Sequence, residues 1–474
     1  MKLNWLRFAL GAVLLVWSGA CPASAGEAQS SDEVLLEALP EKAMPELQAT
    51  LVHAMSQSPR VIASMLDLDQ AKLGEKQAKA PMLPNAAVSA NYGFNQNIYD
   101  YSSYQDAKGE TQAARTRKGI QQLLSYTAGI SQPIYHWGAL QKGYESAQLQ
   151  RAITTRNVGE IRRALAIEIR RSYFGLIGAA NGLEFERIAL ANLEQEKVYL
   201  KQQAADGFVT QSTADYTDVR IKDFKLQMAR SKNSFDSQWL SFCELTGTDR
   251  ASPIPVFPKE IPAIGRDLSP ALQGLAPRPD DYVPASLANA DDSIHAEKLN
   301  YEIVSTRLRP KLGVSLNASQ GYNTPSNIEL YGAPYVLTSY GAAVTVNWSI
   351  FDGFSTKAAK QSSLIRQRQL RTSRDQAERD YRENLKNLLT NLQLNWQSLQ
   401  RTEENLRDAR SGVDVVQKDF EAGMVPKQTW DAAKAAADGA QQSANAARAE
   451  YYIQIVNYLS LRGKDPAVMA APKH

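Results

Sequence analysis

Cysteine, histidine and long apolar runs are all scarce in this sequence of 474 residues. The two cysteines and four histidines form neither a C-x-x-C nor an H-E-x-x-H pattern, so the sequence predicts no metal site. Beyond the N-terminal segment, no stretch reaches the roughly eighteen uninterrupted apolar residues that a membrane helix needs. Any membrane span would therefore have to be built from β-strands.

The chain also lacks a large excess of charge of either sign. The chain has 53 basic and 50 acidic residues, a formal net charge of +3, and no basic block, so nothing predicts a nucleic-acid partner. A P-loop pattern is absent, and any work that the protein supports must draw its energy from a partner. The composition, 43% apolar and 22% charged, is that of a folding chain.

The N-terminus has the pattern of an export signal. A short apolar run between basic residues is followed by Ala23-Ser24-Ala25, which predicts a signal peptide over 1–25. Lipoprotein processing at Cys21 is the alternative, although Ser18 stands where a large aliphatic residue is expected. Cleavage after Ala25 would leave Cys243 without an intramolecular partner, as a small buried apolar residue.

Four segments alternate between apolar side chains and small uncharged ones, as membrane-spanning strands do. A soluble antiparallel sheet with one wet face is the alternative for any single segment. Aromatic residues near the segment ends favour the membrane interpretation, because they resemble an interfacial girdle. The predicted strands are about 85–97, 123–135, 311–323 and 338–351. The interfacial aromatics are Tyr92, Phe94, Tyr135, Trp137, Trp348 and Phe351.

The sequence also repeats itself. A shift of about 216 residues brings Gly207 onto Gly423 and Val209 onto Val425. The first strand of each pair matches at a shift of about 226 instead, which places the length difference in the connection between the first two strands. That connection, from about 97 to 122, would be a long loop on one side of a barrel.

Long helices are predicted after each strand pair. Leucines and other apolar residues stand seven apart over about 354–421, and over about 138–205 until Lys197 interrupts the series. At 1.5 Å per residue each helix would be roughly 100 Å long. Such a stripe alone could belong to any coiled-coil rod, but its direct attachment to barrel-like strands argues against a generic one. Return helices are predicted over about 213–246 and 428–462.

Each long helix ends at a glycine turn and restarts at Ser/Thr followed by Asp. The two turns expose apolar residues that suit docking to another helical hairpin, although a helical hairpin needs such a turn in any case. The predicted contact residues are Gly207, Phe208, Val209, Gly423, Met424 and Val425.

Domain boundaries follow from these patterns. We expect a first repeat over 26–247, a proline-rich connector over 248–286, a second repeat over 287–463 and a short tail over 464–474. The connector carries too many prolines for regular helix and would be wrapped around the helices or partly free.

Taken together, these features resemble those of a known family. The signal, the duplicated order of strand, strand, long helix, G-x-V turn and return helix, and the junctions "QPIYHWG" and "WSIFDGF" look like the TolC family of outer-membrane factors. The resemblance covers essentially the whole mature chain.

The resemblance implies an α+β membrane protein of the outer membrane with a large periplasmic part. It implies a homotrimer in which four strands per chain form a shared 12-stranded β-barrel, continued by a coiled-coil α-barrel. Its function would be the exit duct of a tripartite efflux or type I secretion system, with a periplasmic adaptor, an inner-membrane pump and outer-membrane lipid as partners and no cofactor. Asp215 and Asp431 would be candidates for the entrance constriction, with Asp218 as the alternative at the first turn.

Two other function classes are alternatives. An enzyme is disfavoured because the histidines are scattered, and because Glu403 and Glu404 are typical of solvated charges on a helix surface. A periplasmic coiled-coil adaptor or scaffold without a membrane barrel is the closer alternative. It would not explain four strands with an apolar face, and it predicts a soluble mature protein.

Overall fold

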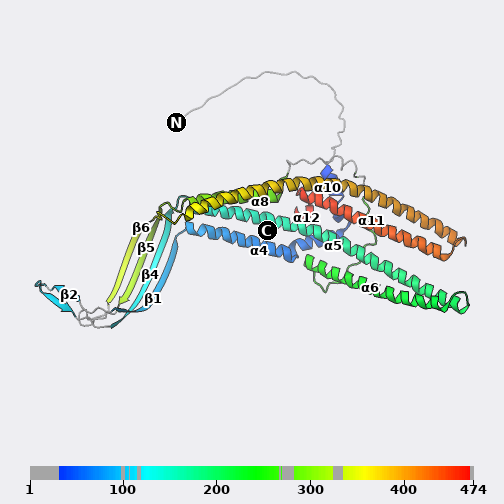
Figure 1. Ribbon diagram of the computed structural model, residues 1–474, viewed down its shortest axis with the longest axis horizontal. Helices are drawn as coiled ribbons and strands as arrows, with labels where there is room; N and C mark the ends of the chain where they lie inside the picture. The colour runs from blue at the N-terminus through cyan, green and yellow to red at the C-terminus, as the bar shows by residue number, and fades with distance from the viewer. Residues whose placement is uncertain are drawn as a thin grey trace, which may run out of the picture.

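The structure is a computed structural model that describes residues 31–97, 102–105, 107–114, 119–265, 268, 282–323 and 335–469. The predicted signal peptide and Cys21 lie outside the described residues. So do most of the connector beyond Gly265 and part of the loop between the first two strands. The molecule is mostly helical and elongated, with a four-stranded sheet at one end and the turns of two helical hairpins at the other (Figure 1).

The sheet is antiparallel and has the order β1-β4-β5-β6. Its strands are β1 (Asn85–Asn97), β4 (Gly119–Tyr135), β5 (Lys311–Asn323) and β6 (Tyr335–Asn347). Pairing of β4 with β5 joins the two halves of the chain, with Ala128 opposite Ala318. Strands β1 and β6 are therefore the two edges of the sheet within one chain. The connection between β1 and β4 carries a small hairpin, β2 (Ser102–Gln105) and β3 (Thr111–Ala114).

The apolar side chains of the sheet are open to solvent in the single chain. Val88 is 81% exposed, Tyr340 83% and Val344 72%, and among the described residues the sheet extends beyond the ends of the helices (Figure 1). Alternation builds this face because successive side chains of a strand point to opposite sides. A sheet that leaves such residues uncovered is unlike the wet-faced sheet of a soluble protein, whose apolar face is packed on a core.

Each strand pair passes into its long helix through two consecutive left-handed residues. These are Trp137 and Gly138 before the first helix (φ 54° and 75°) and Gly353 and Phe354 before the second (φ 64° and 66°). A large aromatic residue in this conformation is strained, so other contacts must hold it. The Trp137 indole N–H donates to the carbonyl of Pro310 at 2.7 Å.

Strand β6 ends at Asn347, although the alternating pattern continues to Ile350. The indole N–H of Trp348 donates to the carbonyl of Leu308 at 3.1 Å, outside the ladder. The Asp352 carboxylate then accepts from the Thr356 backbone N–H at 2.9 Å, which satisfies a free donor in the first turn of the long helix.

Two long helices of equal length dominate the molecule. Helices α5 (Ala139–Ala205) and α10 (Ser355–Glu421) each have 67 residues. Helix α6 (Gln211–Thr246) returns beside α5, and α11 (Lys427–Leu461) returns beside α10. We call α5 with α6 hairpin 1, and α10 with α11 hairpin 2. The predicted seven-residue spacing is confirmed in hairpin 2. The buried residues of α10 include Leu385, Leu392, Leu399 and Leu406.

Several helices were missed by the sequence analysis. Helices α4 (Pro59–Lys79) and α8 (Ala285–Ser305) have 21 residues each and precede β1 and β5. Helix α4 packs on α5, and α8 packs against both α5 and α10. The order across the wall is therefore α4, α5, α8, α10. The remaining short elements are α1 (Ser31–Glu37), α2 (Pro40–Ala43), α3 (Pro45–Gln57), η1 (Ala80–Met82) and α12 (Pro466–Met469).

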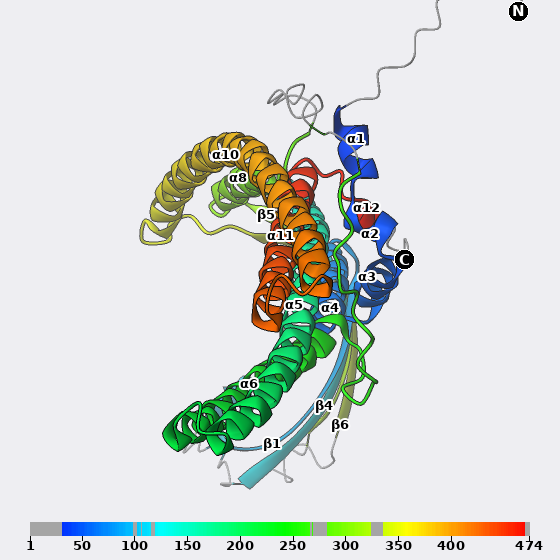
Figure 2. The ribbon, with the colours of Figure 1, turned by 90° about the vertical axis from the view of Figure 1, so that its right-hand side faces the viewer.

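The core lies around the middle of the helices, where residues 31–57 and 465–469 pack on them. Seen along the long axis, the long helices form a curved wall with α1, α2, α3 and α12 on one side of it (Figure 2). The fully buried Arg170 of α5 ties these segments together, with Asp465 at 2.7 and 2.9 Å and with Glu41. Within the described residues, no helix combines the length and the apolar character that crossing a membrane requires.

Candidate functional site

The hairpin turns lie at the end of the molecule farthest from the sheet (Figure 1). Both turns have the same backbone geometry. Gly207 and Gly423 adopt φ of 78° and 76°. The N–H after each glycine reaches back five residues, from Phe208 to Gln203 at 2.9 Å and from Met424 to Asp419 at 2.8 Å. This is the Schellman arrangement, which requires a left-handed residue and so favours glycine.

The residues predicted as partner contacts form a small apolar surface on each turn. Phe208 is 79% exposed and Met424 is 70% exposed, while Val209 and Val425 are half-buried beneath them. An aromatic or thioether side chain exposed at this level on a tight turn has no packing role within the chain. The geometry suits contact with an apolar groove on another protein.

The three acidic candidates lie in different surroundings. Asp215 is exposed and accepts from the Gln211 amide at 3.3 Å, and Asp431 is half-buried on α11. Asp218 is paired across hairpin 1 with Lys197, and with Lys201 at 3.6 Å. The hydrogen bond from Lys197 holds the pKa of Asp218 below its usual range. Asp218 is thus engaged within its own hairpin.

Aromatic contacts close the second turn. The Phe420 and Trp430 rings stack with centroids 5.4 Å apart and planes 4° apart. The Lys434 ammonium lies 4.6 Å from the centre of the Trp430 ring, within the range of a cation–π contact. The two hairpins meet near their ends through a hydrogen bond from Lys427 to the Gln195 side chain, at 3.1 Å.

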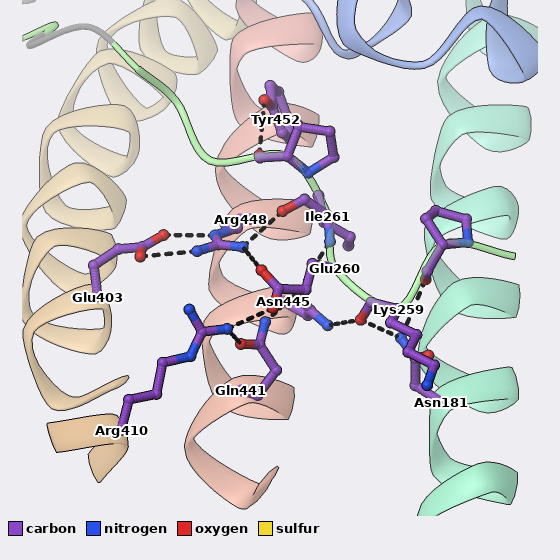
Figure 3. A network of polar contacts seen from close by, with 12 residues as sticks. Asn181, Lys259, Glu260, Ile261, Glu403, Arg410, Gln441, Asn445, Arg448 and Tyr452 are labelled. Atoms are coloured by element: carbon purple, nitrogen blue, oxygen red, sulfur yellow. Dashed lines mark hydrogen bonds and ion pairs between the residues drawn. The ribbon is translucent and has the colours of Figure 1, made fainter. Parts of the chain in front are cut away.

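A groove separates the two hairpins between their ends and the middle of the molecule. It has a volume of about 550 Å³ and is walled by α5 on one side and by α10 and α11 on the other. Its floor includes Lys259 and Glu260 of the connector. We call residues 257–262 the connector strap, because this short irregular segment crosses from hairpin 1 to hairpin 2 (Figure 3).

The strap is bound to hairpin 2 by a dense polar network (Figure 3). Arg448 of α11 donates to both oxygens of Glu403 on α10, at 2.5 and 2.9 Å, and to the backbone carbonyl of Ile261 at 2.7 Å. Asn445 accepts from the Ile261 N–H at 3.0 Å and donates to the carbonyl of Lys259, also at 3.0 Å. The Arg448 side chain is only 5% exposed, so these contacts compensate a nearly buried charge.

The strap reaches hairpin 1 through an aromatic side chain and a single amide. Phe257 packs edge-on against Tyr173, Phe235 and Trp239, with ring centroids 5.8 to 6.4 Å apart. Asn181 of α5 donates to the carbonyl of Lys259 at 2.9 Å. The strap therefore has one anchor in each hairpin.

This network corrects one expectation. Glu403 is not a solvated surface charge, because it forms the two-pronged ion pair with Arg448 and its side chain is only 27% exposed. Sequence reasoning missed the network because a charged residue on a helix facing an irregular segment has no periodic pattern. The prolines of the connector were a signal for this network in the sequence. They prevent regular helix and so leave backbone carbonyls that need hydrogen-bond donors from elsewhere.

The interfacial aromatics fall into two groups. Tyr92 and Phe94 lie toward the far end of β1, with ring centroids 5.1 Å apart. Tyr135 and Trp137 lie at the junction with α5 and contact each other at 4.9 Å, while Trp348 and Phe351 lie at the junction with α10. Within the described residues, no group of three or more His, Cys, Asp or Glu side chains is placed to hold a metal ion.

Comparison with known proteins shows which family shares this architecture. Residues 285–463, which carry α8, β5, β6 and hairpin 2, match the family model described as outer membrane efflux protein. Over these residues the chain is similar to the outer membrane efflux protein family. This similarity supports a location in the outer membrane with a large helical part in the periplasm. The resemblance to TolC-type channels drawn from the sequence is confirmed.

One curated relative is the pyoverdine export outer membrane protein OpmQ of Pseudomonas aeruginosa, 23% identical over 336 residues. That match covers 69% of this chain and 65% of the relative's own length.

Solved channels share the fold. VceC of Vibrio cholerae aligns with a TM-score of 0.62 at 16% identity, over 88% of this chain and 96% of that one. The CmeC channel of Campylobacter jejuni aligns with a TM-score of 0.65 at 13% identity, over 88% and 85%.

Proposed function

We propose that the protein is the outer-membrane exit duct of a tripartite efflux or type I secretion system. The observation that carries this proposal is the continuity of an uncovered apolar sheet with two helical hairpins roughly 100 Å long. The sheet would face lipid, and the hairpins would extend the passage through the periplasm to their turns.

The proposed assembly is a homotrimer. Four strands are too few to enclose a lumen, whereas three chains supply twelve and close a barrel without edges. Two features support closure by copies of the same chain. Strands β1 and β6 are edges within one chain, and α4 and α10 end the row of helices on the corresponding two sides. A continuous ring would follow from pairing one side of each copy with the other side of the next.

The hairpin turns are proposed as the contact with a periplasmic adaptor and, through it, an inner-membrane pump. Their support is the exposed apolar pair Phe208 and Met424 on two turns of identical geometry. The entrance would lie beside them, with Asp215 and Asp431 as candidates for its constriction. Because OpmQ is named for pyoverdine export, exported small molecules of that kind are the first cargo to test.

Planar-bilayer recording tests the proposal directly. Protein purified from detergent-solubilised outer membranes should have the native mass of a trimer and should insert with a small, mostly closed conductance. Changing Asp215 and Asp431 together to Ala should raise that conductance, because an uncharged entrance holds cations less tightly. A monomer that never inserts would support the periplasmic scaffold instead.

A further inference from the structure

The two repeats differ in charge at the junctions where the sheet meets the helices (Figure 1). The segment that leads into β5 and the first two turns of α10 carry five basic residues, which we call the basic junction. They are Arg307, Arg309, Lys311, Lys357 and Lys360. The shifts that relate the repeats place uncharged residues at all five equivalent positions of the first repeat, namely Pro81, Leu83, Asn85, Gln141 and Tyr144. The charge is therefore specific to the second repeat and is not required by the shared architecture.

Two tryptophans hold the segment that carries Arg307 and Arg309. The indole N–H of Trp137 donates to the Pro310 carbonyl at 2.7 Å, and that of Trp348 donates to the Leu308 carbonyl at 3.1 Å. The Arg309 guanidinium lies 4.9 Å from the centre of the Trp137 ring, a cation–π contact that leaves its positive charge in place. Both arginines are exposed, so a segment with defined backbone contacts presents their charges to the surroundings.

The chain itself does not neutralise the basic junction. Within the part of the chain that the structure describes, none of its five side chains forms an ion pair. The nearby acidic residue Asp352 accepts hydrogen bonds from the backbone N–H and the hydroxyl of Thr356. That hydroxyl, with a smaller contribution from the charge of Arg307, holds the pKa of Asp352 below its usual range. Asp352 therefore stays charged, but it offsets at most one of five positive charges.

Basic residues near the start of α5 are arranged differently, because each has an acidic partner on a neighbouring helix. Lys142 pairs with Glu302 of α8 at 2.6 Å, and Arg151 pairs with Glu75 of α4 at 2.8 Å. The first junction is thus close to electrically neutral, whereas the second keeps an excess of positive charge.

A neighbouring copy would add positive charge at this level of the wall. In the proposed trimer α10 borders α4 of the next copy, and the last turns of α4 carry the exposed residues Lys76 and Lys79. Glu75 in the same turns is already engaged within its own chain, by Arg151 at 2.8 Å and by the Tyr144 hydroxyl at 3.0 Å. A partner that balances the basic junction is therefore to be sought outside the protein.

Exposed aromatic residues beside the basic junction indicate a membrane surface as that partner. Phe351 is 69% exposed and Phe354 68%, with their ring centroids 5.3 Å apart. Aromatic residues followed by basic ones are typical of protein segments at the level of lipid headgroups. The headgroups add about 5 to 7 Å on each side of the hydrocarbon core, and Lys360 lies only about 8 Å along α10 from Ser355. The basic junction is thus within reach of headgroup phosphates when the sheet spans the hydrocarbon.

We propose that the basic junction binds the phosphate groups of anionic phospholipids, with one site per chain and three in the trimer. This inference rests on the proposed function, in which the sheet spans the outer membrane and the helices extend into the periplasm. The lipids would belong to the leaflet that faces the periplasm. Because the first junction lacks the five charges, the sites would be separate from one another and would not form a continuous belt.

Native mass spectrometry of the purified trimer tests the site. The trimer is incubated in roughly 0.05 M salt with equal amounts of phosphatidylglycerol and phosphatidylcholine that have the same acyl chains. We expect up to three phosphatidylglycerol molecules to be retained per trimer, with at least tenfold preference over phosphatidylcholine. Roughly 0.5 M salt should reduce the preference, because it screens the attraction between exposed charges. Equal retention of the two lipids in low salt would overturn the inference.

Variants that remove charge locate the site. Arg307→Gln, Arg309→Gln and Lys357→Gln together should lower phosphatidylglycerol retention at least tenfold and leave phosphatidylcholine retention unchanged. Arg307→Gln with Lys357→Gln alone keeps the contact of Arg309 with Trp137 and should lower it about threefold. In both variants the trimer and its thermal midpoint should be retained.

The matched control removes three exposed arginines from the same helix farther from the sheet. Arg366→Gln, Arg368→Gln and Arg371→Gln change residues roughly 17 to 24 Å along α10 from Ser355, beyond the reach of the headgroups. This variant should retain phosphatidylglycerol as the unchanged protein does. Equal loss of retention in the two triple variants would mean that overall charge, and not the basic junction, attracts the lipid.

The outcomes separate this inference from the proposed function. A trimer that inserts and conducts but does not prefer phosphatidylglycerol overturns the lipid site and leaves the exit duct standing. A soluble monomer that never inserts overturns the proposed function and the site together. If soluble glycerophosphoglycerol binds the trimer as tightly as phosphatidylglycerol does, the basic junction is a site for soluble anions and the lipid assignment is wrong.

Discussion

At the scale of single residues, Arg448 carries a nearly buried charge where the connector strap meets hairpin 2. Its guanidinium is nearly buried, and burial opposes its charge, but the hydrogen bonds that it donates to Glu403 outweigh this and raise its pKa. The neighbouring Tyr452, whose hydroxyl donates to the carbonyl of Pro262 at 3.1 Å, has its pKa raised by burial to about 12. Both groups therefore keep their protons, and their hydrogen bonds to the strap, at every physiological pH.

Replacing Arg448 should destabilise the protein strongly. In Arg448→Met, Glu403 keeps its charge without a partner and the Ile261 carbonyl loses its donor, so we expect a loss of about 3 kcal/mol. Thermal unfolding followed by circular dichroism measures the change.

The matched control is Arg187→Met, which breaks an ion pair whose arginine is 69% exposed and should leave the thermal midpoint almost unchanged. Adding Glu403→Gln to Arg448→Met should recover part of the loss, because the uncompensated charge is then removed. Equal losses for the two arginines would mean that Arg448 is not the anchor of the strap.

At the scale of elements, the strap behaves as a short tether between two long hairpins. Its six residues reach Phe257's aromatic cluster in hairpin 1 and the Arg448 network in hairpin 2. Helices α5 and α11 also touch here, where Phe174 stacks on Tyr452 with centroids 6.0 Å apart. The length of the strap should therefore limit hairpin separation without contributing much to the stability of either hairpin.

Lengthening the strap tests this limit. Three residues, Gly-Ser-Gly, inserted between Pro258 and Lys259 in an Asn181→Ala background would keep the Phe257 and Arg448 anchors and lengthen the tether by about 10 Å. The Asn181 change is needed because this side chain ties hairpin 1 directly to Lys259. We expect larger and more variable single-channel conductance with an unchanged thermal midpoint.

The same three residues inserted between Ala251 and Ser252 in the same background lie before the first anchor and serve as the control, with no expected change. If the two insertions have the same effect, the strap does not restrain the hairpins.

At the scale of the whole molecule, a single chain leaves too much apolar surface in water. The sheet exposes its apolar face, and α4 exposes Leu66 (63%) and Leu73 (57%) on the outer side of the helix row. At the other end of the row, α10 exposes Leu364 (43%) and Ile365 (55%). In the proposed trimer, these two stripes would be buried against each other between neighbouring copies.

Charges introduced on α4 should therefore prevent assembly while leaving the single chain folded. For Leu66→Glu combined with Leu73→Glu we expect the native mass in detergent to fall from trimer to monomer, with helix content retained in circular dichroism. Val256→Glu places a charge on a connector residue that is 92% exposed and away from the helix row, and should leave the trimer intact. A trimer that survives the α4 changes would place the interface elsewhere.

The sequence by itself determined the helices, strands and turns that arise from preferences within a single segment. Alternation in β1, β4, β5 and β6, seven-residue spacing in α10 and the glycines of the two turns each reflect a backbone or packing preference within one segment, so no partner is needed to recognise them. Helices α4 and α8 escaped recognition because their faces are shared among several helices and carry no single clean stripe.

Only the tertiary structure decided which distant residues meet. Gly247 illustrates this, since a Cβ there would lie 2.2 Å from the carbonyl oxygen of Gln57, and nothing near Gly247 in the sequence announces that approach. The same holds for the pairing of Lys197 with Asp218 and for the strap bridging two hairpins. Periodicity specifies which face of a segment is buried. Which distant segment covers that face depends on the path of the chain that connects the two segments.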